Sequence, residues 1–167
     1  MNVLNRVRIS FLALACALVL AACVTSGIAQ TAARRAQVES RVHELLNAYA
    51  TNDQDAVPRL VDRHDLAIYG SDISEFVQTP AGLRQMMSDD FRLWHTAKFG
   101  AIRNLDIRVG GDLATAFFDT PFSAGGQPAV SVRFATTWRN ANDVWLLTQS
   151  SNAVPTVDSS ARDLLKR

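Results

Sequence analysis

The C-terminal half of the chain contains four stretches in which apolar and polar residues alternate, and three short turn-rich links separate them. The alternation covers residues 104–109, 113–122, 129–138 and 144–151. A period of two residues is typical of strands that bury one face. Because a parallel return needs about a dozen residues, links this short require antiparallel neighbours. The pattern therefore predicts an antiparallel meander.

The half of the chain before the meander has apolar residues at helical spacing instead. A first helix is predicted over 33–50, where one stripe carries Val38, Val42, Leu45, Leu46 and Tyr49. A short second helix is predicted over 55–62, since Pro58 is tolerated in a first turn. Thr79-Pro80 supplies a hydroxyl cap and a proline at the first helical position, which predicts a third helix over 80–95.

Two weakly alternating segments, 66–71 and 76–78, predict a further short strand or hairpin between the second and third helices. The whole order predicts an α+β fold, with three N-terminal helices packed on a strongly curved antiparallel sheet of four main strands plus the short strand or hairpin. A twisted sheet curls, so amphipathic helices can close its concave side into a cone. We expect an apolar pocket inside that cone.

The N-terminus resembles an export signal. Arg6 and Arg8 precede 9–22, which carries no charged residue. This run is shorter than the roughly 20 apolar residues that cross a bilayer, which favours removal over permanent insertion. We therefore expect residues 1–22 to be a signal peptide, 23–32 a flexible tether, 33–154 the folded domain and 155–167 a loose tail.

The signal ends in Leu20-Ala21-Ala22-Cys23, which resembles the lipobox of bacterial lipoproteins. In that interpretation Cys23 carries the lipid and becomes the mature N-terminus, anchored at a membrane of the cell envelope or periplasm. Ordinary cleavage after 27–29, which also offers small residues, is the alternative. The second cysteine, Cys16, lies inside the signal, so the domain has no thiol and no disulfide.

Charge and motif spacing exclude several classes of function. Removal of two signal arginines changes 17 basic and 16 acidic residues to 15 and 16, which gives no basic surface for nucleic acid. His43, His64 and His95 have no metal-ligand spacing, so no metal site is expected. No glycine loop opens a helix to hold a phosphate, and we predict no cofactor.

Several strings in this order resemble the SnoaL-like branch of the nuclear transport factor 2-like superfamily, over about residues 36–153. The strings are Leu45-Leu46-x-Ala48-Tyr49 followed by 53–60, Ile68-Tyr69-Gly70-Ser71-Asp72 with Glu75 close behind, Val132-Arg133-Phe134 leading to Trp138-Arg139, and Trp145-x-Leu147-x-Gln149. The resemblance implies the cone-shaped fold and, in many relatives, dimerisation through the outer face of the sheet.

The chain departs from that family pattern at its last strand. Many relatives carry histidines there, where this chain has Gln149 and Ser151, and Ala135 stands where a threonine is frequent. The superfamily includes isomerases, dehydratases, cyclases, hydrolases, binding proteins and assembly modules. The resemblance therefore implies a fold more firmly than an activity.

Asp119 is the carboxylate that the sequence favours as a proton shuttle, because it ends the apolar run 113–118 and shares a face with Phe117. In relatives such as ketosteroid isomerase a pocket carboxylate moves a proton, and desolvation raises its pKa towards a working value. A turn residue before Pro121 is the structural alternative. Tyr49 could offer its hydroxyl to a ligand carbonyl, or be a core tyrosine with a wet tip.

Arg133 could hold an anionic ligand or form an ion pair with a strand acid such as Asp119. Further ligand-binding residues are predicted at four positions: Tyr69, Trp94, Phe117 and Gln149. Asp72 and Glu75 match the turn of the family, and a solvated cap also explains them.

The sequence leaves three hypotheses open. The first is a binding module that takes a small apolar molecule with one polar group. The second is a cofactor-free isomerase or lyase in which Asp119 and Tyr49 act in the pocket. The third is a dimeric scaffold.

Overall fold

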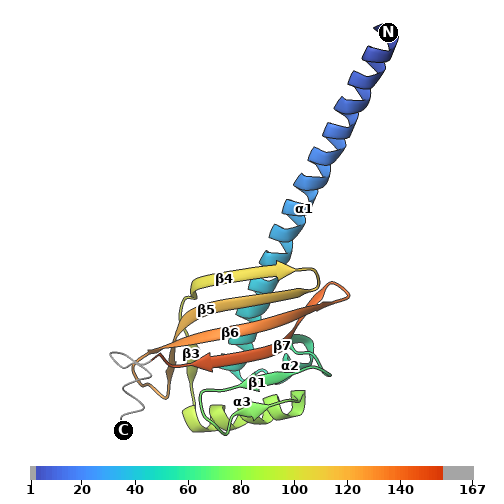
Figure 1. Ribbon diagram of the computed structural model, residues 1–167. Helices are drawn as coiled ribbons and strands as arrows, with labels where there is room; N and C mark the ends of the chain where they lie inside the picture. The colour runs from blue at the N-terminus through green and yellow to red at the C-terminus, as the bar shows by residue number, and fades with distance from the viewer. Residues whose placement is uncertain (1–2, 156–167) are drawn as a thin grey trace, which may run out of the picture. The chain divides into compact units, whose positions relative to one another are not determined.

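The computed structural model describes the backbone of residues 3–155 and the side chains of residues 27–155. The chain divides into two compact units, Met1–Ala36 and Gln37–Arg167. Helix α1 (Val3–Thr51) contains residues of both units, and Figure 1 marks it in blue to cyan. All other helices and strands belong to the second unit.

The first unit is helical throughout its described part. Residues 23–32, which we predicted to be a flexible tether, are also helical; Ala29 and Ala32 favour a helix, and no proline interrupts it. The signal peptide stays a prediction, since the side chain of Cys23 lies outside the described ones. No helix in the described part of the chain has the length and hydropathy to cross a membrane.

The helices of the second unit follow the apolar stripes of the sequence. In the C-terminal part of α1, Val38, Val42 and Leu46 are buried, as the stripe predicts. Helix α2 (Val57–Leu60) is a single turn, shorter than the predicted 55–62. It stops early because Val61 is extended and bridges to Leu147 of the last strand.

Helix α3 (Pro80–Trp94) begins and ends within a residue of the prediction. The Thr79 side chain accepts a hydrogen bond from the Gly82 N–H, and Pro80 occupies the first turn, so the cap is the one the sequence indicates. His95 takes a positive φ of 59° and ends the helix. Leu83 and Met87 are the buried positions of α3.

The sheet has seven strands in the order β2-β1-β7-β6-β5-β3, and β4 also pairs with β5. Their bounds are β1 (Ala67–Tyr69), β2 (Phe76–Val77), β3 (Ala97–Phe99), β4 (Arg103–Gly110), β5 (Leu113–Ala124), β6 (Val130–Ala141) and β7 (Val144–Ala153). The predicted meander is β4 to β7, with antiparallel pairing throughout. The predicted hairpin is β1–β2.

Two details of the sheet differ from the prediction. β1 runs parallel to β7, so the sheet is mixed rather than wholly antiparallel; the long stretch between the paired segments, residues 70–148, supplies the crossover that parallel pairing needs. β3 was not predicted, because three residues are too few for a period of two to be visible. β5 is long enough to pair with β3 at one end and β4 at the other.

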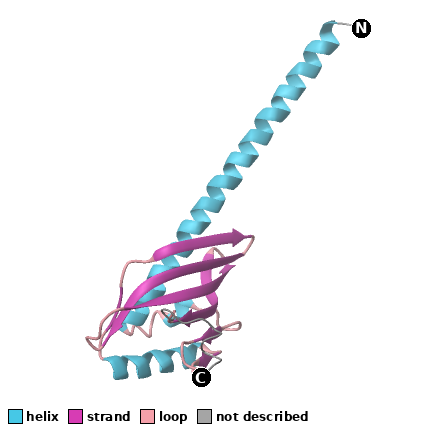
Figure 2. Cartoon of the chain, turned by 60° about the vertical axis from the view of Figure 1, so that its left-hand side comes forward, coloured by secondary structure: helices cyan, strands magenta, loops and turns pink. Residues whose placement is uncertain are grey.

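The two faces of the sheet differ in burial, and this decides where a site can lie. On β5, Ala116, Phe118 and Thr120 are buried, whereas Phe117 is 49% exposed. The inner face forms one hydrophobic core with α1, α2 and α3. Figures 1 and 2 show α2, α3 and the part of α1 that belongs to the second unit on one side of the curved sheet. Functional side chains must therefore be sorted by the face from which they project.

Candidate functional site

A cavity of about 110 Å³ lies between the inner face of the sheet and the helices. It is lined by Leu45, Leu46 and Tyr49 of α1, Ile68, Gly70, Ser71 and Glu75 of the β1–β2 region, Leu83 and Met86 of α3, Phe99, Phe122, Val132 and Phe134 of the sheet, and Leu147, Ser150, Asn152 and Val154 near the end of the chain. All of these residues belong to the second unit. The pocket expected inside the cone is therefore present.

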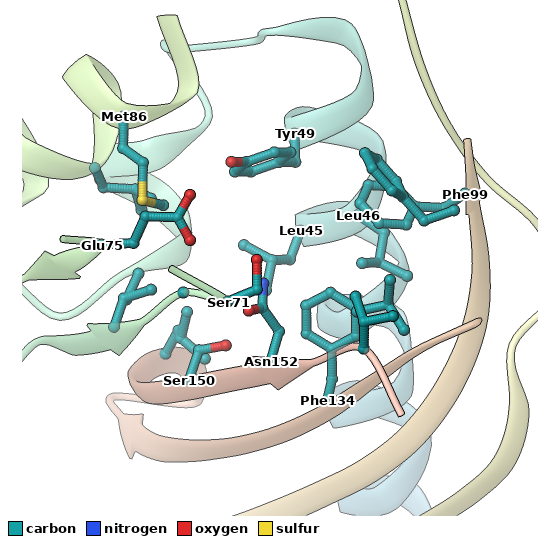
Figure 3. Close-up of a pocket in the computed structure, with 17 residues that line it drawn as sticks. Leu45, Leu46, Tyr49, Ser71, Glu75, Met86, Phe99, Phe134, Ser150 and Asn152 are labelled. Atoms are coloured by element: carbon teal, nitrogen blue, oxygen red, sulfur yellow. The ribbon is translucent and has the colours of Figure 1, made fainter. Parts of the chain in front are cut away.

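One side of the cavity is an apolar wall. The rings of Phe99 and Phe122 lie 5.1 Å apart, and Phe134 meets Phe99 edge-on at 6.2 Å between centroids. Figure 3 shows Phe99 and Phe134 together on this side of the cavity. Such an arrangement suits a flat apolar group, because offset and edge-on ring contacts are favourable. The volume is close to that of a dry cavity that takes one benzene-sized guest, which is about 150 Å³.

The opposite side of the cavity is polar, and Glu75 is its charged group. Figure 3 shows the Glu75 carboxylate directed into the cavity, on the same side as the Tyr49 hydroxyl. Its Oε2 accepts a hydrogen bond of 3.0 Å from the Asp72 N–H. The Gly70 N–H donates to the Glu75 carbonyl at 2.8 Å, which closes the loop between β1 and β2.

Gly70 is what allows the carboxylate to reach this position. A Cβ at residue 70 would overlap Glu75 Oε2, Cδ and Cβ, well inside van der Waals contact. Asp72 supports the same loop, since its Oδ1 accepts from the N–H of Ser74 at 2.8 Å and from the Ser74 hydroxyl at 2.6 Å. A short, well-bonded loop therefore holds an acid against an apolar space.

Tyr49 donates its hydroxyl proton to Asp90 Oδ2 on α3. Burial, the hydrogen bond to Asp90 and the charges of Asp90 and Glu75 all raise the pKa of Tyr49 far above its usual value. Burial also raises the pKa of Asp90, helped by the charges of Glu75 and Asp89 and opposed by the Tyr49 hydrogen bond. Tyr49 therefore stays protonated at neutral pH, with its proton directed to Asp90.

Asn152 completes the polar side. Its Oδ1 is buried and has no hydrogen-bond partner among the described residues. Buried acceptors without a partner are uncommon in folded proteins and call for an explanation. Ser71 and Ser150 place hydroxyls in the same part of the lining. The exposed Ser71 and Val154 mark where the cavity opens.

The family assignment rests on the sequence of the second unit. A family model described as a SnoaL-like domain matches residues 38–156. The chain belongs to the SnoaL-like domain family. The matched range contains every residue that lines the cavity. No curated protein matches the sequence.

Solved structures share the fold of this SnoaL-like domain at low sequence identity. A nuclear transport factor 2-like protein from Salmonella enterica has 15% identity and a TM-score of 0.67, with 78% of this chain and 97% of that chain covered. A hexachlorocyclohexane dehydrochlorinase of the LinA type from Novosphingobium barchaimii has 15% identity and a TM-score of 0.65, covering 77% and 91%. A nuclear transport factor 2-like protein of unknown function from Pseudomonas putida has 12% identity and a TM-score of 0.65, covering 77% and 91%. These likenesses confirm the predicted fold.

The structure places Asp119 away from the cavity of this SnoaL-like domain. Its neighbours Phe118 and Thr120 are buried on the inner face, so Asp119 projects from the outer face. There its carboxylate accepts from Asn104 Nδ2 at 2.8 Å and from Arg133 Nε at 3.0 Å, and these bonds lower the pKa of Asp119. The acid proposed as the shuttle is thus an ion-paired acid of the outer face, and Arg133 forms the ion pair with Asp119 that was the second of its two predicted roles.

Of the other predicted residues, only Tyr49 lines the cavity. Phe117 and Gln149 project from the outer face, because each alternates with buried neighbours. Tyr69 is exposed and stacks on Phe76 at 4.6 Å. Trp94 lies behind the wall, with its ring 5.0 Å from that of Phe122.

The sequence interpretation assigned no ligand-binding role to Glu75, Ser150 and Asn152. Glu75 was noticed as part of a turn, but a turn residue can face solvent or a cavity, and only the Gly70 contact decides between them. Asn152 lies beyond the predicted end of the last strand at 151. Among the residues whose side chains are described, no group of three His, Cys, Asp or Glu could hold a metal ion.

Proposed function

We propose that this SnoaL-like domain binds a small, largely apolar molecule that carries one polar group. The observation that carries the proposal is the cavity of about 110 Å³, with phenyl rings on one side and Glu75, Tyr49 and Asn152 on the other. Apolar pockets with a few convergent polar groups are the usual form of small-molecule sites. The size limits the guest to about one ring.

Toluene is a suitable probe of the apolar wall, and its binding to the full-length chain can be followed by NMR titration. The variant Val132→Phe should fill part of the cavity and weaken toluene binding about tenfold or more, since overpacked sites exclude a guest. Val130→Phe is the matched control, because Val130 is exposed on the same strand and does not line the cavity. Equal toluene affinity in both variants and wild type would contradict binding in this cavity.

A cofactor-free isomerase or lyase is the second candidate, and Glu75 is the observation in its favour. A carboxylate that faces an apolar space can take a proton from a bound substrate. Tyr49, however, directs its proton to Asp90 and so does not offer it to a developing oxyanion. The geometry therefore supports binding better than proton transfer.

Deuterium exchange separates these two candidates. A proton-abstracting site should exchange the α-protons of bound cyclohexanone in D₂O, and Glu75→Gln should remove this exchange. A binding module should show no exchange above the buffer rate. Deuterium exchange that depends on Glu75 would favour the isomerase or lyase function over a binding module.

We further propose that the chain is exported and held at a cell-envelope membrane by a lipid on Cys23. The charged, then apolar, N-terminus and the lipobox-like end of this run support this location. Homodimerisation through the outer face of the sheet also remains a proposal, which the exposed Phe117 supports. Size-exclusion chromatography with light scattering tests the dimer.

A further inference from the structure

We infer that the polar group of the ligand is a hydrogen-bond-donating cation, in the simplest case a protonated amine. The inference rests on the proposed binding function and names the chemical class that the cavity selects. It follows from the donors and acceptors that the described side chains present to the cavity, and from the sign of their charge.

The lining is negative. Glu75 is its carboxylate, and none of the described residues that line the cavity is Lys, Arg or His. Asp90 adds a second acid directly behind Tyr49. Arg133, which the sequence suggested as a residue that could bind an anion, is paired with Asp119 on the outer face. An anionic ligand would therefore meet repulsion from Glu75 and find no cationic partner among the described lining residues, whereas a cation would meet an opposite charge.

The polar side also presents three oxygens that can only accept from a ligand, beside the Ser71 and Ser150 hydroxyls, which can donate or accept. A carboxylate only accepts hydrogen bonds, and Glu75 uses one for the Asp72 N–H. The Tyr49 hydroxyl already donates its one hydrogen bond to Asp90, so towards a ligand its oxygen can only accept. Asn152 Oδ1 is a buried acceptor without a partner among the described residues. A ligand with several N–H donors satisfies these oxygens, and a ligand carbonyl satisfies none of them.

An ammonium group fits this arrangement better than a hydroxyl does. An ammonium has three N–H donors and a full positive charge, while a hydroxyl has one O–H donor and no charge. Hydrogen bonds to charged groups are roughly twice as strong as neutral ones. The apolar wall of Phe99, Phe122 and Phe134 would then hold the organic part of the amine, and its ring contacts are those already described.

Four probes of one shape test the inference with the full-length chain at neutral pH: toluene, benzyl alcohol, benzylamine and benzoate. We expect benzylamine to bind about tenfold or more tightly than toluene or benzyl alcohol, and benzoate to bind most weakly. Equal affinities for toluene and benzylamine would overturn the inference and leave the proposed function standing. Failure of all four to bind would instead overturn the proposed function.

Variants locate the effect at the cavity. Glu75→Gln should reduce the preference for benzylamine over benzyl alcohol to about twofold or less, because it removes the charge and keeps the shape. Glu39→Gln is the matched control, since Glu39 is exposed on α1 and does not line the cavity. An unchanged preference in a folded Glu75→Gln protein would overturn the inference.

Asn152→Asp gives a result of the opposite sign. It places a second carboxylate at the polar side without a change of shape, and the preference for benzylamine should rise above that of wild type. A fall in that preference, in protein whose circular dichroism matches wild type, would contradict the assignment of Asn152 Oδ1 as a ligand acceptor.

Discussion

Glu75 occupies the space that a side chain on Gly70 would need. The overlap would involve the carboxylate, Cδ and Cβ of Glu75, so the charge at the cavity depends on the absence of a Cβ five residues earlier. The two residues are also joined by the hydrogen bond from the Gly70 N–H to the Glu75 carbonyl. Position and charge of the acid are therefore set by one tight loop between β1 and β2.

Gly70→Ala should displace Glu75 and weaken benzylamine binding about as much as Glu75→Gln does. The clash reaches Cβ of Glu75, which cannot rotate away without the backbone, so we also expect a loss of about 1–2 kcal/mol in the free energy of unfolding. Isothermal titration and urea denaturation measure the two effects. Gly27→Ala is the control, because a Cβ there meets no atom within 4 Å. Unaltered amine affinity in Gly70→Ala would show that the loop does not position the acid.

Asp90→Asn should make the protein more stable at neutral pH. The pKa of Asp90 is raised in the folded state by burial and by the charges of Glu75 and Asp89, so folding favours its protonated form. Wild-type stability from this group is thus present at low pH and falls as pH rises from about the ordinary value of 3.8 through the raised pKa. Asparagine keeps an acceptor for Tyr49 and has no charge to desolvate.

The measurement for Asp90 is the difference in melting temperature between the variant and wild type across pH. The difference should be near zero in acid, grow as pH rises from about 3.8 through the raised pKa of the folded state, and level off above it. A variant less stable than wild type at neutral pH would mean that the charged Tyr49–Asp90 bond outweighs the cost of burial. That outcome would overturn the prediction.

Asp62→Asn should have the opposite pH dependence. Burial alone would raise the pKa of Asp62, but the His64 N–H and the Arg139 guanidinium lower it below 3.8. Its stabilisation is therefore present at neutral pH and is lost as pH falls through the folded pKa. We expect a loss of about 1–3 kcal/mol at pH 7, since Asp62 is only 2% exposed. Urea denaturation at pH 7 and in acid should show this loss shrinking as the wild-type carboxylate is protonated.

Cys23→Ala tests the proposed lipid anchor. A chain without the Cys23 thiol cannot receive the lipid, so it should leave the membrane fraction or remain unprocessed. Membrane fractionation and the mass of the mature N-terminus give the answer. Cys16→Ala, within the same apolar run, should change neither. Unchanged processing and fractionation of Cys23→Ala would favour cleavage after residues 27–29 instead.

Much of the fold could be predicted because its signals are local. The period of two in the last four strands, the apolar stripe of α1 and the Thr79-Pro80 start of α3 all lie within short windows of sequence. The parallel pairing of β1 with β7 could not, because it joins Ile68 to Ser150 across the chain and leaves no local pattern. β3 was missed because its three residues carry too little pattern.

The candidate site was predicted less well, and Asp119 shows why. Its alternation with Phe118 was visible, but the sequence does not say which of the two faces of a strand meets the helices until the buried partners are known. A helical stripe identifies its own buried side, and Tyr49 of the α1 stripe lines the cavity. Its hydroxyl, however, donates a hydrogen bond to Asp90 on another helix. The two residues are 41 positions apart in the sequence, and no local signal encodes that contact.

The pairing of β3 and β4 with opposite ends of β5 has a consequence for solubility. Because β3 and β4 both pair with β5, this edge of the sheet consists of two short edge strands, one of three residues and one of eight. β4 is further interrupted by an irregularity between Arg103 and Asp106 and carries the exposed pair Arg108–Asp106. A strand of another molecule pairs poorly with edge strands that are short, charged or irregular. This side of the molecule is thereby protected against aggregation by strand addition.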